Sequence, residues 1–534
     1  MVSHEAVNFL FVFGATAAIA CLAAIGIFQA SIDHKVVNVS ELDQAGHSRY
    51  QRKDAAATGE TKRRPNVIML LAEDLGYGDL KCMGHPYART PNIDSIARDG
   101  MKFMSFHSTG KTCAPARGGL MTGNNPSSMK YYYGDDGFDI NNMLTVTELF
   151  HNSGYRTGHV GKWHIGDEEN MKNGVYGIDY VKKRAGGESD YWYKDETVYD
   201  AAIEYIKDNR EEPFYLNVWG HVAHSPIKPK EHLADMFDDV KVKKEDFGKH
   251  FWPKLKLSQS LNKDLDRNMA YYLGGLFSMD YNVGRLLKTI DELGLRNDTI
   301  IAFTGDHGAA TMGRGSSTSQ NMLGYCGGLR DYKHSYYEGG VRVPFLVRWP
   351  GTIPAGKTDN SPMSFLDWLP TACSLAAVPY KESSIEGENF SDVWLGGQER
   401  KRDRPLYWNK EGGGDYAMLS QSGEWKLHFN VDDRWELYNL KDDIEENNNL
   451  VKCVPTKAKH MKTKLREWTK TLPSVYCRSK RCKSAKFGKL DRGKDLEGSC
   501  TDYEEYMSSD GFVPVEGFPK PAIPPVEANR DDST

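Results

Sequence analysis

Short, uninterrupted apolar runs alternate with longer amphipathic stretches between residues 65 and 400. Continuous apolar runs of this length predict strands that are buried on both faces. They lie at residues 66–72, 214–219, 299–303 and 344–349. Helical spacing of apolar residues occupies the intervals, at residues 198–206, 272–293 and 365–377. Because strands that alternate with helices form a mainly parallel sheet, we expect a large α/β domain over residues 65–400, with helices on both faces of the sheet.

The pattern changes after residue 400. Three short runs are typical of strands in an antiparallel sheet, at residues 407–408, 416–419 and 425–429. A helical pattern follows near residues 457–470. We therefore expect a smaller C-terminal α+β subdomain over residues 401–513, built on a short antiparallel sheet. The proline-rich residues 514–534 predict an extended or disordered tail.

The N-terminal segment contains the longest apolar stretch of the chain. Residues 7–28 are interrupted only by Asn8 and Thr16, and the stretch is long enough to span a bilayer. Residues 1–30 therefore predict a secretory signal peptide or an uncleaved membrane anchor, and the poor cleavage pattern slightly favours the anchor. Residues 31–64 are polar and predict a linker. Both alternatives direct the chain to the secretory route, whether lysosomal, lumenal, extracellular or periplasmic.

Charge, sequons and cysteines narrow the class of protein further. The formal net charge of −5 argues against a nucleic-acid-binding protein. Asn-x-Ser/Thr triplets make Asn38, Asn297 and Asn389 candidate glycosylation sites. Four of the nine cysteines crowd the C-terminal part, at positions 453, 477, 482 and 500. Disulfides among them fit an oxidising compartment, free thiols are the alternative, and the lack of a C-x-x-C pair argues against zinc.

One short run, residues 113–123, carries the strongest chemical signal. Cys113 is followed by Pro115 and Arg117 and then by a Leu-x-Thr-Gly tail. Proline is favoured in the first turn of a helix, so Cys113 is expected at a helix N-terminus, where free N–H groups and the helix dipole attract anions. Arg117, one turn later, can reach back to the same place. A buried structural cysteine in front of a helix is the alternative.

Two pairs of polar residues directly follow predicted strands. Glu73 and Asp74 follow the first apolar run, and Asp306 and His307 follow the third. Because sites in parallel sheets form beyond the carboxyl ends of the strands, we expect both pairs to lie at one site.

The run at 113–123 resembles the signature of the sulfatase family, C-x-P-x-R-x-x-L-x-T-G. Further segments resemble that family's other motifs, in the family's order, at residues 71–79, 161–166, 224–226, 303–308, 333–344 and 437–450. The resemblance covers residues 65–450 and is strongest to the arylsulfatase and N-acetylgalactosamine-6-sulfatase branch, within the alkaline-phosphatase superfamily.

The resemblance implies a hydrolase of sulfate esters, either aryl sulfates or sulfated carbohydrates. A formylglycine-generating enzyme would oxidise Cys113 to formylglycine (3-oxoalanine), the nucleophile. The implied ligands of a divalent metal are Glu73, Asp74, Asp306, His307 and the modified residue 113. The implied roles of the other residues are as follows: Arg117, Lys162 and Lys333 hold the nucleophile and the sulfate oxygens, His224 and Lys333 protonate the leaving alcohol, and His164 removes a proton from the second hydroxyl.

Two positions depart from the family pattern. Glu73 stands where the family usually has aspartate, and His307 replaces the commoner asparagine. Oxygen ligands suit Ca²⁺ best, with Mg²⁺ possible, while an imidazole suits Mn²⁺ or Zn²⁺ better. His307 is compatible with an alternative function, a phosphonate monoester or phosphodiester hydrolase of the same superfamily. Glu73 is compatible with a second alternative, a homologue that binds sulfated glycans without catalysis.

Basic residues are dense between residues 452 and 492. This region would attract a sulfated polymer electrostatically, and a solvated basic helix and loop is the alternative interpretation.

Overall fold

A computed structural model describes residues 63–129, 143–166, 171–182, 194–311, 320–409, 415–430, 432–472 and 494–495. The chain divides into two compact units, residues 1–61 and 62–534, and all described residues belong to the second. The predicted N-terminal signal or anchor, Asn38 and the C-terminal tail therefore lie outside the described residues. Within the described part of the chain, no helix combines the length and the apolar character needed to cross a membrane.

The core of the second unit is an eight-stranded sheet in the order β5-β4-β6-β1-β7-β8-β2-β9. The strands are β5 (Tyr180–Lys182), β4 (Arg156–Gly161), β6 (Phe214–Trp219), β1 (Asn66–Ala72), β7 (Thr299–Gly305), β8 (Phe345–Arg348), β2 (Met101–Phe103) and β9 (Lys357–Asp359). The first five in this order pair in parallel, β8 runs antiparallel to both of its neighbours, and β2 and β9 pair in parallel. The prediction of a mainly parallel sheet is therefore confirmed.

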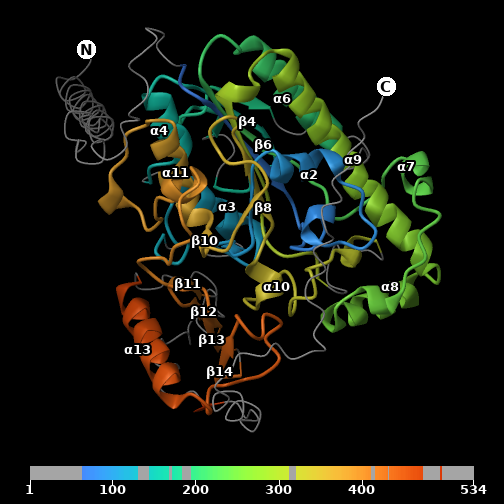
Figure 1. The fold of residues 1–534 in the computed structure, drawn as a ribbon, viewed down its shortest axis with the longest axis vertical. Helices are drawn as coiled ribbons and strands as arrows, with labels where there is room; N and C mark the ends of the chain where they lie inside the picture. The colour runs from blue at the N-terminus through green and yellow to red at the C-terminus, as the bar shows by residue number, and fades with distance from the viewer. Residues whose placement is uncertain are drawn as a thin grey trace, which may run out of the picture. The chain divides into compact units, whose positions relative to one another are not determined.

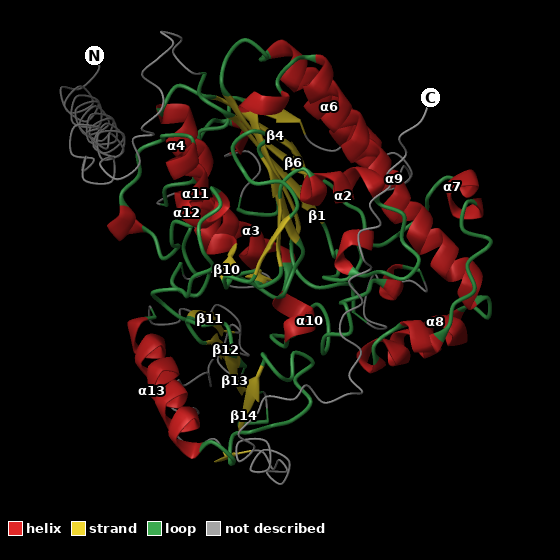
Figure 2. Cartoon of the chain, viewed as in Figure 1, coloured by secondary structure: helices red, strands yellow, loops and turns green. Residues whose placement is uncertain are grey.

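Helices cover both faces of this sheet because successive side chains of its strands point to opposite sides (Figure 2). Ile68 and Leu70 of β1 pack into one core and Val67 and Met69 into the other. The first core takes in α2 (Pro91–Arg98), α6 (Lys194–Asp208), α8 (Trp252–Leu261) and α9 (Leu265–Glu292). The second takes in α3 (Cys113–Thr122), α4 (Val146–Asn152), α11 (Trp368–Leu375) and α12 (Ser391–Trp394).

The C-terminal part forms the expected smaller sheet (Figure 1). Its antiparallel strands are β11 (Leu406–Asn409), β12 (Tyr416–Leu419), β13 (Trp425–Phe429) and β14 (Arg434–Asn439). A two-residue strand, β15 (Lys494–Asp495), pairs in parallel with β14. Helix α13 (Pro455–Thr471) buries Ala458, Met461 and Leu465 in a core shared with the sheet. The α+β prediction for this part of the chain is therefore confirmed.

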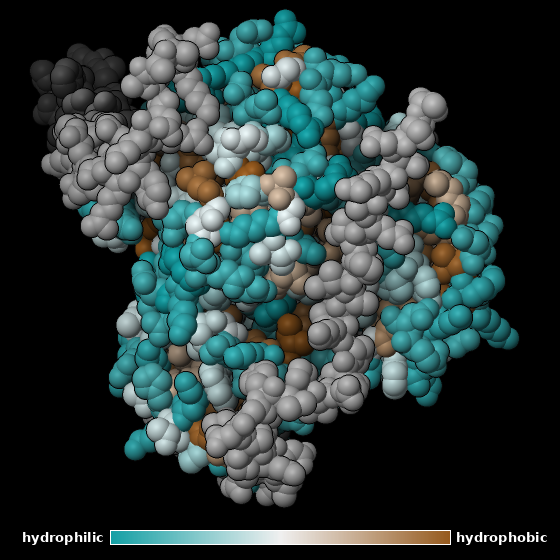
Figure 3. Space-filling model, viewed as in Figure 1, coloured by the Kyte–Doolittle hydropathy of each residue, from teal (hydrophilic) through white to brown (hydrophobic). Residues whose placement is uncertain are grey.

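The remaining described strands and α-helices are short. Strands β3 (Phe106–His107) and β10 (Met363–Ser364) pair in parallel. Helices α7 (Glu231–Asp235) and α10 (Glu338–Val341) complete the described set. Hydrophilic residues cover most of the face drawn in Figure 3, and apolar residues form small separate groups on it.

The described residues include some of the predicted modification sites. Asn297 is exposed, as a glycan acceptor must be, whereas Asn389 is partly buried and its Oδ1 accepts a hydrogen bond from the Ser391 N–H at 2.9 Å. Cys453 is disulfide-bonded. Cys477, Cys482 and Cys500 lie outside the described residues, so the pairing stays a prediction.

Candidate active site

The two polar pairs that follow β1 and β7 meet at one edge of the sheet. These strands are parallel neighbours, and Ala72 pairs with Gly305 at their carboxyl ends. The backbone N–H of Asp74 donates a hydrogen bond to Asp306 Oδ1 at 3.0 Å. Glu73 and Asp306 are fully buried and Asp74 almost so. A single parallel register thus brings together residues that are 232 positions apart in the sequence.

Cys113 begins helix α3, as the sequence predicted, after an extended Thr112. The helix ends at Gly123, whose φ of 66° lies in the left-handed region that favours glycine. The Cys113 sulfur lies 3.3 Å from His307 Nε2, 3.5 Å from Glu73 Oε1 and 3.8 Å from Lys333 Nζ. The thiol therefore lies at the centre of the polar cluster, and the helix dipole points at it.

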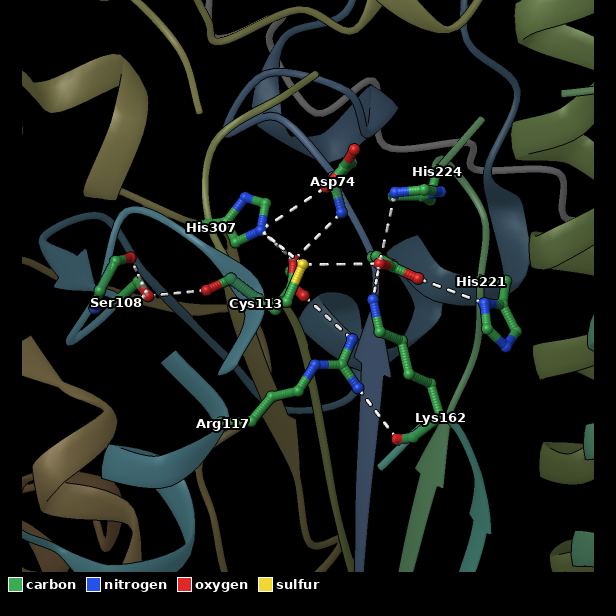
Figure 4. A network of polar contacts seen from close by, with 12 residues as sticks. Asp74, Ser108, Cys113, Arg117, Lys162, His221, His224 and His307 are labelled. Atoms are coloured by element: carbon green, nitrogen blue, oxygen red, sulfur yellow. Dashed lines mark hydrogen bonds and ion pairs between the residues drawn. The ribbon is translucent and has the colours of Figure 1, made fainter. Parts of the chain in front are cut away.

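Three cations neutralise the carboxylates around the thiol. The Arg117 guanidinium donates to Asp306 Oδ2 at 2.9 Å and to the Lys162 carbonyl at 3.0 Å. The Lys162 ammonium pairs with Glu73, and Lys333 Nζ lies 2.6 Å from Asp74 Oδ1. Figure 4 shows Asp74, His307, Arg117 and Lys162 arranged around Cys113. The site thus holds a balanced set of charges in a volume that is mostly closed to water.

This environment lowers the pKa values of Cys113, Glu73 and Asp306. Burial alone would raise the pKa of the Cys113 thiol, but Lys162 and other cations lower it to about 6. Burial likewise opposes ionisation of Glu73, and the Lys162 ammonium outweighs it and holds the Glu73 pKa well below its usual value. For Asp306, His307 and Arg117 overcome burial and lower the pKa to about 2. Both carboxyls are therefore ionised at neutral pH.

The donor groups fit a divalent cation. Ligand atoms of Asp74, Cys113 and His307 lie within 4.8 Å of one another, and so do those of Glu73, Cys113 and Asp306. The Nδ1 of His307 donates to the Gly308 carbonyl at 2.9 Å, which leaves Nε2 facing the cluster as a ligand atom. Carboxylate oxygens dominate this set and suit Ca²⁺ or Mg²⁺, and the one imidazole extends the choice to Mn²⁺.

The two predicted acid–base histidines differ in position. His224 lies at the edge of the cluster, with Nε2 3.8 Å from Glu73 Oε1 and Nδ1 donating to the Ser225 carbonyl at 2.8 Å. His164 is exposed and has a φ of 60°. Across the described ranges, no hydrogen bond or ion pair joins His164 to the cluster. The structure thus brings together all the predicted site residues except His164.

Two residues that the sequence did not single out support the cluster. The Nδ1 of His221 lies 3.2 Å from Glu73 Oε2. Buried Asp195 accepts hydrogen bonds from the backbone N–H groups of His221, at 2.6 Å, and Val222, at 3.2 Å. The position of His221 just beyond β6 was a usable signal, because side chains at strand ends form sites. Asp195, near the start of α6, carries no such signal.

Comparison with known proteins agrees with this geometry. The family model described as Sulfatase matches residues 65–378, and a model for the C-terminal region of N-sulphoglucosamine sulphohydrolase matches residues 328–471. Arylsulfatase A of Homo sapiens is 30% identical over an alignment of 394 residues, with 69% of this chain and 75% of that protein covered. N-acetylgalactosamine-6-sulfatase of Canis lupus familiaris is 28% identical over 444 residues, covering 75% of this chain and 78% of that one.

Solved structures share the fold. Ps i-CgsB in complex with k-i-k-neocarrahexaose has a TM-score of 0.65 at 24% identity and covers 77% of this chain and 94% of its own. BT4656 in complex with its substrate D-glucosamine-2-N,6-O-disulfate has a TM-score of 0.63 at 20% identity and covers 77% and 98%. The family model spans more than half of this chain and arylsulfatase A reaches 30% identity, so the chain belongs to the sulfatase family and is a sulfuric ester hydrolase.

Proposed function

We propose that residue 113, converted from cysteine to formylglycine, is the nucleophile that cleaves the sulfate ester of a sulfated carbohydrate or an aryl sulfate at a divalent-metal site. The observation that carries the proposal is the position of the Cys113 sulfur, within 4 Å of Glu73, His307 and Lys333 at the N-terminus of α3. Formylglycine in its hydrated form supplies two hydroxyl groups on one carbon, one to attack sulfur and one whose deprotonation expels sulfate. The modification requires a formylglycine-generating enzyme as a partner in the cell.

The metal would be held by Glu73, Asp74, Asp306 and His307 together with residue 113. A divalent cation, Ca²⁺ first and Mg²⁺ or Mn²⁺ as alternatives, supplies charge that neutralises sulfate oxygens and acidifies the attacking hydroxyl. The left-handed backbone of Asp74, with φ of 57°, turns its carboxylate toward Lys333 and His307. The ionised state of Glu73 and Asp306 at neutral pH is the state that a cation needs.

The cationic side chains bind and orient the anion. Arg117 is fully buried and held by Asp306 and the Lys162 carbonyl, so its role is to fix the charge balance beneath the nucleophile. The ammonium groups of Lys162 and Lys333 flank residue 113 and are available to sulfate oxygens. Burial lowers the pKa of each lysine, but the neighbouring anions outweigh burial and raise it above its usual value. Both lysines therefore stay protonated.

Two histidines move protons in this scheme. His224 is partly exposed at the edge of the cluster, and its Nε2 points inward because Nδ1 is bound to the Ser225 carbonyl. This nitrogen protonates the departing alcohol oxygen, with Lys333 as the second donor. His164 is exposed on the loop after β4, and we assign to it removal of the proton from the second hydroxyl once substrate closes the site.

A sulfated glycan is the substrate class we favour. The relatives named above include an N-acetylgalactosamine-6-sulfatase, and BT4656 was solved with a sulfated glucosamine as its substrate. The secretory route, in which such glycans occur, is consistent with the apolar N-terminal segment and the three sequons.

The test is hydrolysis of 4-nitrophenyl sulfate by protein from the native host, beside mass spectrometry of the peptide that contains residue 113. We expect turnover, an aldehyde at residue 113, and loss of turnover in the variant Cys113→Ala. An unmodified thiol together with no turnover would refute the catalytic proposal and favour a homologue that binds sulfated glycans without cleaving them, the alternative that Glu73 keeps open.

A second candidate function follows from His307. An imidazole in the ligand set keeps open a phosphonate monoester or phosphodiester hydrolase. Bis(4-nitrophenyl) phosphate and phenylphosphonate monoesters, assayed beside 4-nitrophenyl sulfate, separate the two. A kcat/KM higher for the diester than for the sulfate would replace the sulfatase proposal.

A further inference from the structure

An ion pair joins the segment that carries the nucleophile to the C-terminal subdomain. Lys111 lies two residues before Cys113, and its ammonium pairs with Asp415, the residue directly before β12. The same ammonium lies 4.1 Å from the centre of the buried Tyr336 ring. The Lys111 side chain is 11% exposed and that of Asp415 18%, so both still reach solvent.

The segment that carries Lys333 is hydrogen-bonded to the backbone of Lys111. The backbone N–H of His334 donates to the Lys111 carbonyl at 2.9 Å, and the N–H of Lys333 donates to the Ala309 carbonyl at 3.0 Å. His334 is exposed and has a φ of 74°. Lys333 in turn contacts Asp74 in the catalytic cluster. Lys111, His334 and Lys333 therefore lie along one edge of the site, on the side of the C-terminal subdomain.

The electrostatics support the same arrangement. Although His334 reaches solvent, the part of its imidazole that is buried lowers its pKa to about 4, and the positive charges of Lys333, His307 and Lys111 add to the effect. His334 thus lies within the electrostatic reach of both the catalytic cluster and Lys111, and its imidazole is neutral at neutral pH.

We propose that Asp415, Lys111 and His334 form a subsite that binds hydroxyl groups of the sugar ring bearing the scissile sulfate. The inference rests on the proposed function and deepens it, because it assigns substrate specificity to the C-terminal subdomain. Asp415 supplies a charged acceptor, Lys111 a charged donor, and His334 a neutral group that can do either. The ion pair has no net charge, and a second sulfate or a uronate would meet the Asp415 carboxylate. The chemistry therefore fits a neutral, hydroxyl-bearing pyranose.

Asp415 is the residue to change, because substitutions of Lys111 lie two positions from Cys113 and would disturb its conversion to formylglycine. The variants are Asp415→Asn and, independently, His334→Gly, which suits the left-handed backbone. Asp442→Asn, in the turn after β14, is the matched control on the same subdomain. For each full-length protein, kcat and KM are measured on N-acetylgalactosamine 6-sulfate, glucosamine 2-N,6-O-disulfate and 4-nitrophenyl sulfate, with the formylglycine fraction determined by mass spectrometry.

Loss of one charged hydrogen bond to a hydroxyl costs about tenfold or more in binding. We expect kcat/KM on N-acetylgalactosamine 6-sulfate, divided by kcat/KM on 4-nitrophenyl sulfate, to fall about tenfold in Asp415→Asn. The change should lie mainly in KM. The control should keep the wild-type ratio. An unchanged ratio in both Asp415→Asn and His334→Gly overturns the subsite. So does a wild-type enzyme that cleaves the aryl sulfate but neither sugar.

A rise in activity on the disulfated sugar in Asp415→Asn would support the proposal, since the variant lacks the carboxylate that a second sulfate would meet. A wild-type protein that cleaves none of the three compounds refutes the proposed function itself, and the subsite with it. The two failures are therefore distinguishable.

Discussion

Substitution of Lys426 by methionine tests whether a buried ion cluster fastens the C-terminal sheet to the catalytic domain. Lys426 lies in β13, and its Nζ is 2.5 Å from Oε1 of Glu338, the first residue of α10. Both side chains are fully buried. Glu338 also binds Arg342 at 2.5 Å and His107 at 3.1 Å. Burial opposes ionisation of Glu338, but Lys426 and Arg342 hold its pKa well below the usual value, and Arg342 remains beside Glu338 in the variant.

The magnitude follows from what the substitution leaves behind. Methionine fills the space of the lysine stem without its charge. Breaking a buried ion pair from one side costs roughly 3–5 kcal/mol. Because Arg342 still compensates Glu338, we expect a loss near the lower end, about 3 kcal/mol in the free energy of unfolding. The assay is urea unfolding followed by tryptophan fluorescence, and Trp408 lies 5.3 Å from the Lys426 ammonium as a local reporter.

The matched control removes the same charge from an exposed pair. Lys288 and Glu292 lie 3.1 Å apart on α9 with side chains 74% and 63% exposed. Lys288→Met should cost about 0.5 kcal/mol or less, since exposed pairs contribute little. A loss in Lys426→Met that lies within about 1 kcal/mol of the control would refute the reasoning, because burial would then add nothing to the cost.

Three further predictions concern the active-site region. His159 makes edge-to-face contacts with the rings of Trp163 and Trp219, and burial together with Arg117 lowers its pKa to about 3. Below about pH 6.5 this histidine binds a proton in the unfolded chain but not in the folded one, so the free energy of unfolding is about 2 kcal/mol smaller at pH 5 than at pH 7.5. His159→Phe should remove this loss, which a comparison of unfolding at pH 5 and pH 7.5 measures. Lys162→Met should raise the pKa of the unconverted Cys113 thiol above its value of about 6, because the variant lacks the Lys162 charge. Iodoacetamide should then alkylate Cys113 more slowly at pH 7, and an unchanged rate would contradict the role assigned to Lys162. Chelation by EDTA should abolish sulfatase activity and lower the melting temperature, both restored by added Ca²⁺ or Mn²⁺, and activity that survives exhaustive chelation would exclude the metal role.

Hydrophobic pattern predicted those strands whose residues are apolar on both faces. Strands β1, β6 and β7 are buried at every position, and their runs contain few polar residues. Strand β4 is buried at every position but its first, although its sequence, Arg-Thr-Gly-His-Val-Gly, shows no apolar run. His159 of β4 is fully buried against the rings of Trp163, just after β4, and Trp219, at the end of β6. Whether such a segment forms a buried strand depends on tertiary packing, which the local sequence pattern does not show.

The same division applies to the site. Motifs identified the residues whose spacing along the chain is fixed, and the structure assembles nearly all of them around Cys113. It also adds partners that no spacing reveals. Lys111 and Asp415 are 304 positions apart, and His221 and Glu73 are 148 apart. The Lys111–Asp415 pair depends on how the two sheets meet, and the His221–Glu73 pair depends on the pairing of β6 with β1, so only the folded chain shows which residues become partners.

The departure at Glu73 shows how such hidden partners change the meaning of a motif. One carboxylate oxygen of Glu73 faces the Cys113 sulfur at 3.5 Å and pairs with Lys162, while the other lies 3.2 Å from His221 Nδ1. An aspartate on the same backbone would be shorter by one carbon–carbon bond, about 1.5 Å. It would have to give up its contact with either Cys113 or His221, because a hydrogen bond does not survive a lengthening of that size. The extra methylene thus allows one side chain to face residue 113 and a histidine at the end of β6 at once, and this favours Glu73 as a ligand that His221 holds in place.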